Sequence, residues 1–179
     1  MGPARDSLIH PAGRQSMQIP ATHIIHQTEH WLLNHHLASA LPGYLMLGSK
    51  LPVESLADLP DAALAEMGVL MAKVQRVLEQ ALQPKWLYIG RFGHSPGFPI
   101  HFHFIPVYAW VEKAFWADAR YRSLSQFAHV EAAASQTDGA ELTLFVWREF
   151  GEAPVPPAVQ GPSIEQVIAL LRGCFVQPQ

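Results

Sequence analysis

The sequence predicts an α+β fold: an antiparallel sheet of about five strands with a packed helix, followed by a carboxy-terminal α/β extension. Three observations predict it. Short segments rich in Ile, Leu, Val and aromatic residues follow one another from residue 22, with turn residues between them. One long helical pattern interrupts them. The strands are joined by hairpin-type turns and not by regular strand–helix alternation, which predicts helices on one side of the sheet.

The composition divides the chain into three parts. Residues 1–21 mix Gly, Pro, Ser and charged residues without a period, so we expect a flexible arm. Residues 22–110 hold the predicted sheet and its helix. Residues 111–179 are expected to add a helix, a strand and a helix packed on the same domain. A chain of 179 residues is long enough for one domain with such an appendage.

Five strands and the long helix can be placed in the central part. The segment THIIHQT, residues 22–28, predicts the first strand. The segments HWLLNHH and GYLMLGS predict a hairpin with strands over 31–36 and 44–48, joined through a Pro-Gly turn. A helix is predicted over 60–83, because apolar residues recur every three or four positions after acidic residues and a proline. Strands over 86–91 and 100–108 follow.

The extension is predicted from three further segments. Residues 111–129 indicate a helix, although their apolar pattern is less regular. The segment ELTLFVWREF, residues 141–150, has strong β propensity and predicts a strand. After a proline-rich linker, Ser163 and Gln166 match a capping box, which predicts a short final helix.

Charge and cysteine content exclude several classes of protein. The formal net charge is −3 and no run of Lys and Arg exceeds a pair, so a nucleic-acid interface is not expected. The single cysteine, Cys174, excludes an internal disulfide and indicates a reducing compartment. Neither a signal peptide nor an apolar run of about 18 residues is recognisable. We therefore expect a cytoplasmic protein that contacts neither nucleic acid nor membrane.

The segment PIHFHFIPVY, residues 99–108, carries the side chains best suited to chemistry. Because side chains alternate between the two faces of a strand, His101 and His103 are predicted to share one face and their apolar neighbours to enter the core. The two histidine backbones then lie roughly 6–7 Å apart. This spacing suits three roles: binding a metal ion, dividing a nucleophile from its helper on one phosphate, or occupying a solvated sheet face.

A metal site would need more ligands than this pair. Zinc sites use a third protein ligand and usually a fourth. The available residues show no spacing that indicates one: His35, His36, His94 and Glu112. No metal site is therefore predicted, although a metal-dependent hydrolase that uses the two histidines stays an alternative.

The same segment resembles the signature of the histidine-triad superfamily, in which three histidines alternate with apolar residues and proline often follows. With Pro106 as the anchor, His101 falls on the middle position and His103 on the third. The first triad histidine is then replaced by Pro99. The order of segments over 22–110 is also similar to the family order, so the resemblance covers about half of the chain.

This resemblance implies an activity. Family members bind nucleotides and cleave or transfer at the α-phosphate, so His101 would attack phosphorus and carry the nucleotidyl group. His103 would donate to the phosphate, and Asn34 would lie near the ribose. The implied partners are a purine nucleotide or nucleotide conjugate and a second copy of the chain, as a homodimer. No cofactor is implied beyond a divalent cation that could accompany the nucleotide.

The loop before the histidine strand supplies the other nucleotide-binding candidates. Glycine lets a backbone approach a phosphate closely, so His94, Ser95 and Gly97 are predicted to contact it. Arg91 precedes this loop and could reach the same phosphate, although the sequence favours an exposed arginine at this position.

Replacement of the first histidine leaves three possibilities. Proline has no ionisable group and no backbone donor, so Pro99 cannot protonate a leaving group. Another residue supplies the proton (His94, His35 or His36), the leaving group needs none, or catalysis is weak. A nucleotide-binding protein with impaired catalysis is therefore the alternative function. Trp31, just before Asn34, is a further candidate for stacking on the base.

Overall fold

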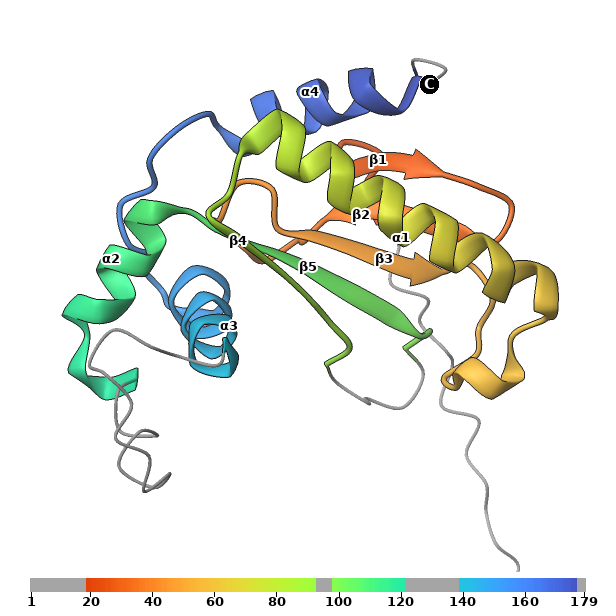
Figure 1. Cartoon of the computed structure of the whole chain (residues 1–179), viewed down its shortest axis with the longest axis horizontal. Helices are drawn as coiled ribbons and strands as arrows, with labels where there is room; N and C mark the ends of the chain where they lie inside the picture. Colours follow the sequence, from red (N-terminus) through yellow and green to blue (C-terminus); the bar gives the residue numbers. More distant parts are fainter. Residues whose placement is uncertain (1–18, 93–97, 122–138, 177–179) are drawn as a thin grey trace, which may run out of the picture.

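A computed structural model describes residues 19–92, 98–121 and 139–176 of the chain. Within them, five antiparallel strands form one sheet with the order β1-β2-β3-β5-β4 (Figure 1). The strands are β1 (Ile24–Gln27), β2 (Trp31–His35), β3 (Leu45–Ser49), β4 (Trp86–Gly90) and β5 (His101–Val107). The α+β class and the hairpin of β2 and β3 are confirmed. The histidine strand β5 lies inside the sheet, between β3 and β4.

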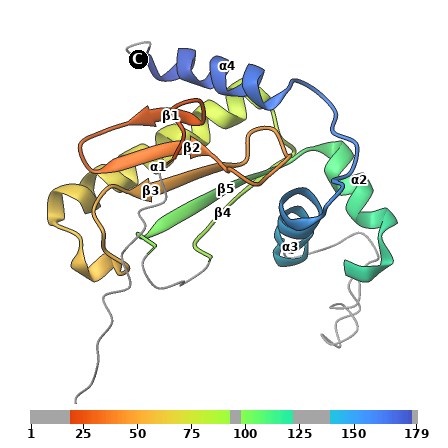
Figure 2. The ribbon, with the colours of Figure 1, turned by 180° about the vertical axis from the view of Figure 1, so that it is seen from behind.

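One face of the sheet is covered by two helices, α1 (Asp61–Leu82) and α4 (Ile164–Val176), as Figures 1 and 2 show. The predicted helix over 60–83 is confirmed, and a 3-10 turn, η1 (Leu56–Asp58), precedes it. Its buried side chains pack on the inward residues of the strands and of α4 in one apolar cluster. The cluster includes Trp31, Leu33, Leu45, Leu47, Leu70, Val74, Leu78, Ile100, Phe104, Val167 and Leu171.

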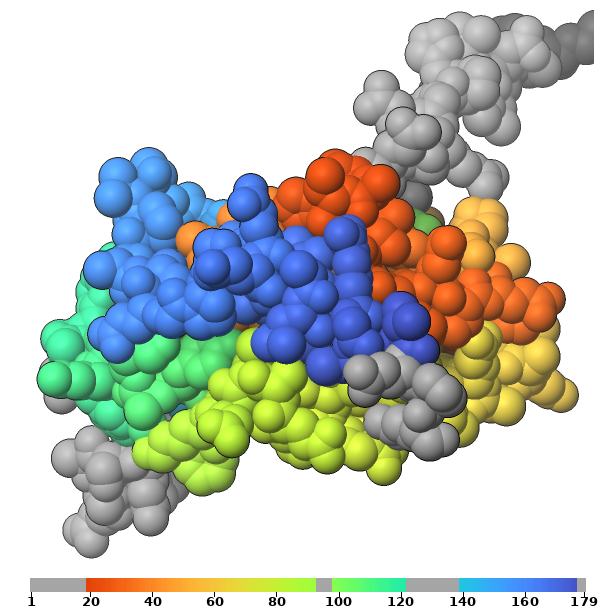
Figure 3. All heavy atoms as spheres, turned by 90° about the horizontal axis from the view of Figure 1, so that it is seen from above, coloured from red at the N-terminus to blue at the C-terminus, as the bar shows by residue number. Residues whose placement is uncertain are grey.

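The final helix closes this layer over the edge of the sheet. Seen from above, α4 lies across the surface between β1 and α1 (Figure 3). Its Arg172 donates to the carbonyl oxygens of Ile24 and Ala21 at 2.8 and 2.7 Å. The predicted capping box is confirmed, because Ser163 Oγ accepts from the Gln166 amide at 3.2 Å and the Gln166 side chain accepts from the Ser163 amide at 2.9 Å.

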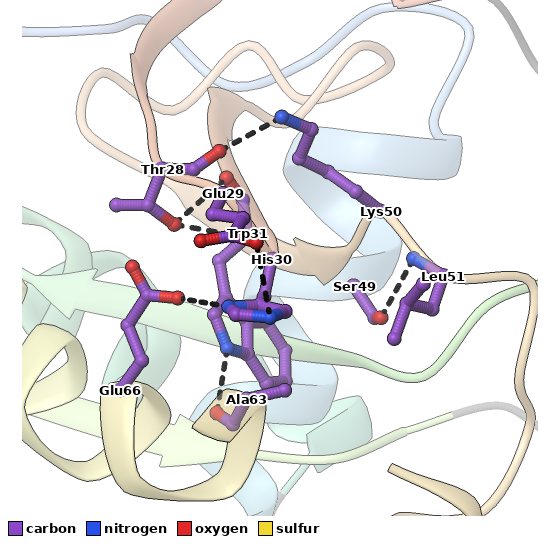
Figure 4. Close-up of polar contacts among 9 residues, drawn as sticks. All are labelled: Thr28, Glu29, His30, Trp31, Ser49, Lys50, Leu51, Ala63 and Glu66. Carbon is purple, nitrogen blue, oxygen red and sulfur yellow. Dashed lines mark hydrogen bonds and ion pairs between the residues drawn. The ribbon is translucent and has the colours of Figure 1, made fainter. Parts of the chain in front are cut away.

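Polar contacts tie the β1–β2 turn to the first turns of α1 (Figure 4). The Trp31 indole Nε1 donates to the Ala63 carbonyl at 2.9 Å, and His30 Nδ1 lies 2.8 Å from the Glu66 carboxylate. Trp31 is fully buried. The interpretation of Trp31 as a base-stacking residue is therefore wrong, because its ring fills the space between β2 and α1.

The opposite face of the sheet also carries helices. α2 (Ala109–Ala117) and α3 (Ala140–Val146) pack against the end of β5, and α3 continues into a π-helical turn, η3 (Trp147–Glu152). A second apolar cluster joins them: Ile105, Val107, Val111, Phe115, Leu142, Phe145, Val146 and Phe150, with Leu41 and Tyr44. The expectation that helices occupy only one side of the sheet is therefore wrong.

The segment 141–150, predicted as a strand, is helical in α3 and η3. Its buried residues are Leu142, Phe145, Val146 and Phe150, a spacing of three and four that lies along one side of a helix. The β propensity of the single residues misled the prediction, because burial of this side against α2 and β5 outweighs propensity.

The remaining predictions for the extension are met in part. α2 begins at Ala109 and ends at Ala117, well before the predicted limit of 129, and residues 122–138 lie outside the described residues. Most of the predicted arm, residues 1–18, lies outside them as well. None of the described helices has the length and apolar character that crossing a membrane requires.

Candidate functional site

The strand β5 brings His101 and His103 to one face, the face opposite α1, as predicted from side-chain alternation. His103 pairs with Met46 of β3, and Met46 pairs with Asn34 of β2, so these three side chains form one row across the sheet. His101 pairs with Gly48 in the next row. Gly48 has no side chain, and among the described residues a Cβ added to it would meet only the His101 Cβ, at 3.9 Å.

The tautomer of His101 is set by the backbone. Its Nδ1 lies 2.9 Å from the Pro99 carbonyl oxygen, which can only accept a hydrogen bond. Nδ1 therefore carries the hydrogen, and Nε2 of the neutral ring keeps its lone pair. Pro99 has no imidazole to offer, yet its carbonyl oxygen still orients the neighbouring histidine.

His103 lies deeper in the molecule and has a different environment. Its Nδ1 is 3.0 Å from the Tyr44 hydroxyl, and its buried Nε2 has no hydrogen-bond partner among the described residues. Burial, reinforced by the nearby His101 and His36, lowers the pKa of His103 to about 3. A polar contact with the Phe92 backbone opposes this shift, but it lies outside the geometry of a full hydrogen bond to Nε2. The ring is therefore neutral at pH 7, and Nε2 is an unused polar atom of the kind that a ligand satisfies.

Aromatic rings surround His103. Its ring centroid lies 5.1 Å from that of His101, 5.5 Å from Phe92, 5.7 Å from Trp147 and 6.0 Å from His36. Trp147 belongs to η3, so the carboxy-terminal extension forms part of the wall around the histidines. This burial explains why the face that carries them is not a solvated sheet surface.

His36 follows β2 and is one of the three residues considered for the missing proton donor. Its ring packs on Tyr44 at 4.6 Å and on Trp147 at 5.9 Å, and its Nδ1 accepts from the Ala38 amide at 3.3 Å. Burial, with the adjacent His35 and the nearby His101, lowers the pKa of His36 to about 4. A neutral His36 with this hydrogen bond carries its proton on Nε2.

The other two candidates for this role differ from His36. His35 is fully buried, and both of its ring nitrogens face backbone carbonyl oxygens, of His36 at 3.0 Å and of Leu41 at 3.1 Å. Because a neutral imidazole has one N–H, His35 donates to one of these oxygens, and its other nitrogen faces the second carbonyl, so neither nitrogen points toward a substrate. His94 lies outside the described residues.

Two of the predicted nucleotide-binding residues, Asn34 and Arg91, are described by the structure, and each has its own hydrogen-bond partner. Asn34 lies in the row of His103, is 3% exposed, and donates its side-chain amide to the His35 carbonyl at 2.8 Å. The Arg91 guanidinium donates to the Glu54 carbonyl at 2.5 Å, which links the end of β4 to the segment before α1. Contact of either residue with a nucleotide stays a prediction. The loop candidates His94, Ser95 and Gly97 lie outside the described residues.

Two residues of the site were missed from the sequence. Tyr44 immediately precedes β3, and only the pairing of β3 with β5 brings it beside His103. Trp147 lies in the segment 141–150, and the incorrect strand prediction for that segment gave no reason to place it near His103. Among the described residues, no three His, Cys, Asp or Glu side chains come together as a metal ion would require.

No family model matches the chain, and no curated protein does. Among solved structures, the chain is similar to a zinc-bound histidine triad family protein from Mycobacterium smegmatis, with a TM-score of 0.50 and 17% identity over 88% of this chain and 85% of that chain. The chain has a histidine-triad-like fold. This alignment covers more than residues 1–110 alone could supply, so the histidine-triad-like architecture includes part of the extension.

Two further structures align over about half of the chain. A Hit-like protein from Bartonella henselae gives a TM-score of 0.44 and 18% identity over 51% of this chain and 73% of that one. The diadenosine triphosphate hydrolase of Plasmodium falciparum gives 0.46 and 15% over 51% of this chain and 65% of that one. At these identities the likeness concerns the histidine-triad-like fold and not the activity.

Proposed function

We propose that this protein binds a nucleotide and cleaves or transfers at its α-phosphate through a nucleotidyl group on His101. The observation that carries the proposal is the arrangement of His101 and His103. Their ring centroids lie 5.1 Å apart, and their Nδ1 atoms have different partners, the Pro99 carbonyl and the Tyr44 hydroxyl. His101 keeps a lone pair on Nε2, because Nδ1 donates to Pro99. His103 keeps a buried Nε2 with no partner among the described residues, which suits a phosphate oxygen.

The reaction proceeds in two displacements. The lone pair of His101 Nε2 attacks the α-phosphorus and forms a P–N bond, while the bond from phosphorus to the leaving group breaks and its electrons leave with that group. The positive charge on the substituted ring is stabilised because Nδ1–H donates to the Pro99 carbonyl. Water or another acceptor then attacks phosphorus, its proton passes to solvent, and the P–N electron pair returns to Nε2.

The leaving group must gain a proton without help from Pro99. Among the described residues, His36 is the candidate donor, because its ring lies 6.0 Å from that of His103 and its charge is coupled to that of His101. An arriving phosphate favours the protonated ring and so raises the low pKa of His36. A leaving group such as pyrophosphate, which needs little protonation, is the alternative.

The choice of substrate follows the resemblance and the open surface beside His101. A purine base or ribose can lie against the sheet over Gly48, which contributes no side chain to this face. One similar structure is a diadenosine triphosphate hydrolase, and we include that class in the panel of substrates. The other classes are adenosine phosphoramidate and an AMP–lysine conjugate.

We also propose that the chain forms a homodimer through β4 and α1. β4 is an edge strand of the sheet, and two of its apolar side chains are exposed, Trp86 by 49% and Ile89 by 36%. Sedimentation of the purified protein beside Trp86→Lys tests this arrangement. A dimer that the substitution converts to a monomer supports it, and a wild-type monomer contradicts it.

The activity is tested by turnover of the substrate panel by the wild-type protein, His101→Ala and His26→Ala. His26→Ala is a matched control, because it removes an imidazole that stacks on Phe175 of α4, with the ring centroids 4.7 Å apart. We expect nucleoside monophosphate release that is lost in His101→Ala and kept in His26→Ala. Release that persists in His101→Ala contradicts the nucleophile.

A protein that binds AMP without turnover of any substrate would instead support the alternative function, a nucleotide-binding protein with impaired catalysis. The absence of an imidazole at Pro99 is the observation that favours this second candidate. Turnover that is lost with a chelator and restored by one metal ion would support the metal-dependent alternative.

A further inference from the structure

The Tyr44 hydroxyl is buried against His103 and makes one hydrogen bond among the described residues, to His103 Nδ1 at 3.0 Å. We infer that Tyr44 is a positioning residue: its hydroxyl donates to Nδ1 and holds His103 as the neutral tautomer with hydrogen on Nε2. His103 would then present a donor, and His101 beside it a lone pair. The effect on turnover rests on the proposed function, whereas the tautomer does not.

The direction of this hydrogen bond follows from the partners available. If His103 Nδ1 donated to Tyr44, the hydroxyl hydrogen of Tyr44 would need another buried acceptor, and none is present among the described residues. The lone pair on Nε2 would also be buried without a donor. Each unsatisfied buried group costs about 1–3 kcal/mol. With Tyr44 as the donor, the hydroxyl and Nδ1 are both satisfied, and Nε2–H alone awaits a partner.

The ionisation states agree with this direction. Burial raises the pKa of Tyr44 above its ordinary value, so the hydroxyl keeps its hydrogen. Burial and the neighbouring histidines lower the pKa of His103 to about 3, so the ring has only one N–H at neutral pH. A neutral ring with a fixed donor on one side must have its hydrogen on the other side.

His101 and His103 therefore present different groups to a ligand, although their side chains are chemically identical. The Pro99 carbonyl accepts from His101 Nδ1, so His101 Nε2 can attack. Tyr44 donates to His103 Nδ1, so His103 Nε2–H can bind a phosphate oxygen on which negative charge develops. Because the Pro99 carbonyl and the Tyr44 hydroxyl belong to the folded protein, each tautomer is set before a ligand binds.

Tyr108 provides a matched control for Tyr44. Its hydroxyl is also largely buried, its pKa is also raised by burial, and it donates to the Pro42 carbonyl at 2.8 Å. Tyr108 therefore loses a comparable hydrogen bond on substitution by phenylalanine. Its hydroxyl is bonded to Pro42 and not to His103, so Tyr108→Phe should leave the histidine tautomer unchanged.

The experiment measures the His103 tautomer by two-bond proton–nitrogen correlation NMR of ¹⁵N-histidine-labelled protein at pH 7, with His103→Gln to assign the signals. We expect an Nε2–H ring in the wild-type protein and in Tyr108→Phe. Tyr44→Phe should give a mixture of tautomers and bind AMP roughly tenfold more weakly, the equivalent of about 1.4 kcal/mol.

A wild-type His103 ring with hydrogen on Nδ1 would overturn the inference, and so would an unchanged tautomer in folded Tyr44→Phe. The wild-type spectrum tests the predicted His103 tautomer even if Tyr44→Phe does not fold. Failure of the proposed function is distinguishable, because absence of turnover on every substrate would leave the expected tautomer in place. Conversely, turnover with the wrong tautomer would retain the function and reject the role of Tyr44.

Discussion

The two faces of the sheet are both buried, but they are buried in different ways. The face toward α1 and α4 is filled by apolar side chains, and the Trp31 indole that enters it is bonded to the Ala63 carbonyl. The opposite face carries His103, whose pKa is lowered and whose buried Nε2 has no hydrogen-bond partner among the described residues, and beside it lies His36, whose pKa is lowered as well. This difference indicates that the first face is stabilised throughout by apolar packing, whereas on the second face the apolar cluster of α2 and α3 stabilises the fold and the polar groups around His103 add little.

This comparison assigns opposite phenotypes to the two faces. Substitutions in the α1 face should lower the free energy of unfolding and leave the intrinsic affinity for nucleotide in the folded fraction. Substitutions in the histidine face should lower nucleotide affinity with little loss of stability. The predictions below test this separation.

The largest stability effect is expected from Phe104→Ala. Phe104 is fully buried in the α1 face, between His103 and Ile105 on β5. Removing its ring leaves a cavity, and we expect a loss of about 3–5 kcal/mol in the free energy of unfolding, measured by urea denaturation. His101→Ala, three residues away on the other face, should cost under about 1 kcal/mol. Equal losses in the two variants would contradict the comparison.

The two faces also differ in how much of their structure could be predicted from the sequence. The α1 face was predicted well, because the periods of 3.6 and 2 residues identify the buried sides of α1 and of the hairpin strands without tertiary information. The pair His101 and His103 was placed on a shared face by the same alternation. Helix caps are short-range features, so the capping box was also recoverable, as Ser163 and Gln166 show.

The surroundings of the histidines could not be predicted in the same way. Trp147 reaches His103 only because the segment 141–150 forms a helix and a π-helical turn, where single-residue propensity favoured a strand. Tyr44 reaches His103 through the pairing of β3 with β5, which are separated by α1 and β4 along the chain. Contacts of this kind depend on the assembled fold and leave no local pattern.

The next largest effect is expected at the turn between β2 and β3. Gly43 has φ +81°, and an added Cβ would lie 2.5 Å from Leu82 Cδ1 and 3.0 Å from the Tyr108 hydroxyl. Gly43→Ala should therefore lower the free energy of unfolding by about 1–3 kcal/mol. Gly173→Ala is the control, because α4 leaves its Cβ open space and alanine should stabilise the helix by up to about 1 kcal/mol. Loss of stability in both would contradict this explanation.

A smaller effect on stability, with a large effect on binding, is expected from the double variant Tyr44→Phe/His103→Leu. Replacing both partners of a buried hydrogen bond by apolar groups is close to neutral, and the unpartnered Nε2 is removed as well. We expect the free energy of unfolding to change by less than about 1 kcal/mol and AMP affinity, measured by calorimetry, to fall at least tenfold. A loss as large as that of Phe104→Ala would show that the histidine face also stabilises the fold.

The smallest effect concerns a polar contact at the margin of the α1 face, between His30 and Glu66 (Figure 4). Partial burial favours the neutral acid, but hydrogen bonds from His30 and Thr28 outweigh it and lower the pKa of Glu66 below its ordinary value of 4.5. A carboxyl with a lowered folded pKa adds stability above its unfolded pKa and loses that contribution as the pH falls through the folded pKa. Both side chains are partly exposed, so the contribution is small.

We therefore expect Glu66→Gln to reduce the free energy of unfolding by about 0.5 kcal/mol at pH 6 and by less as the pH falls toward 3. Urea denaturation at the two pH values measures this difference. Glu79→Gln is the matched control, because Glu79 lies on the same helix and accepts from the neutral Gln75 side chain at 2.9 Å. If both variants change with pH to the same extent, the contact with His30 does not stabilise the α1 face, and the closure of that face rests on its apolar contacts and the Trp31–Ala63 hydrogen bond.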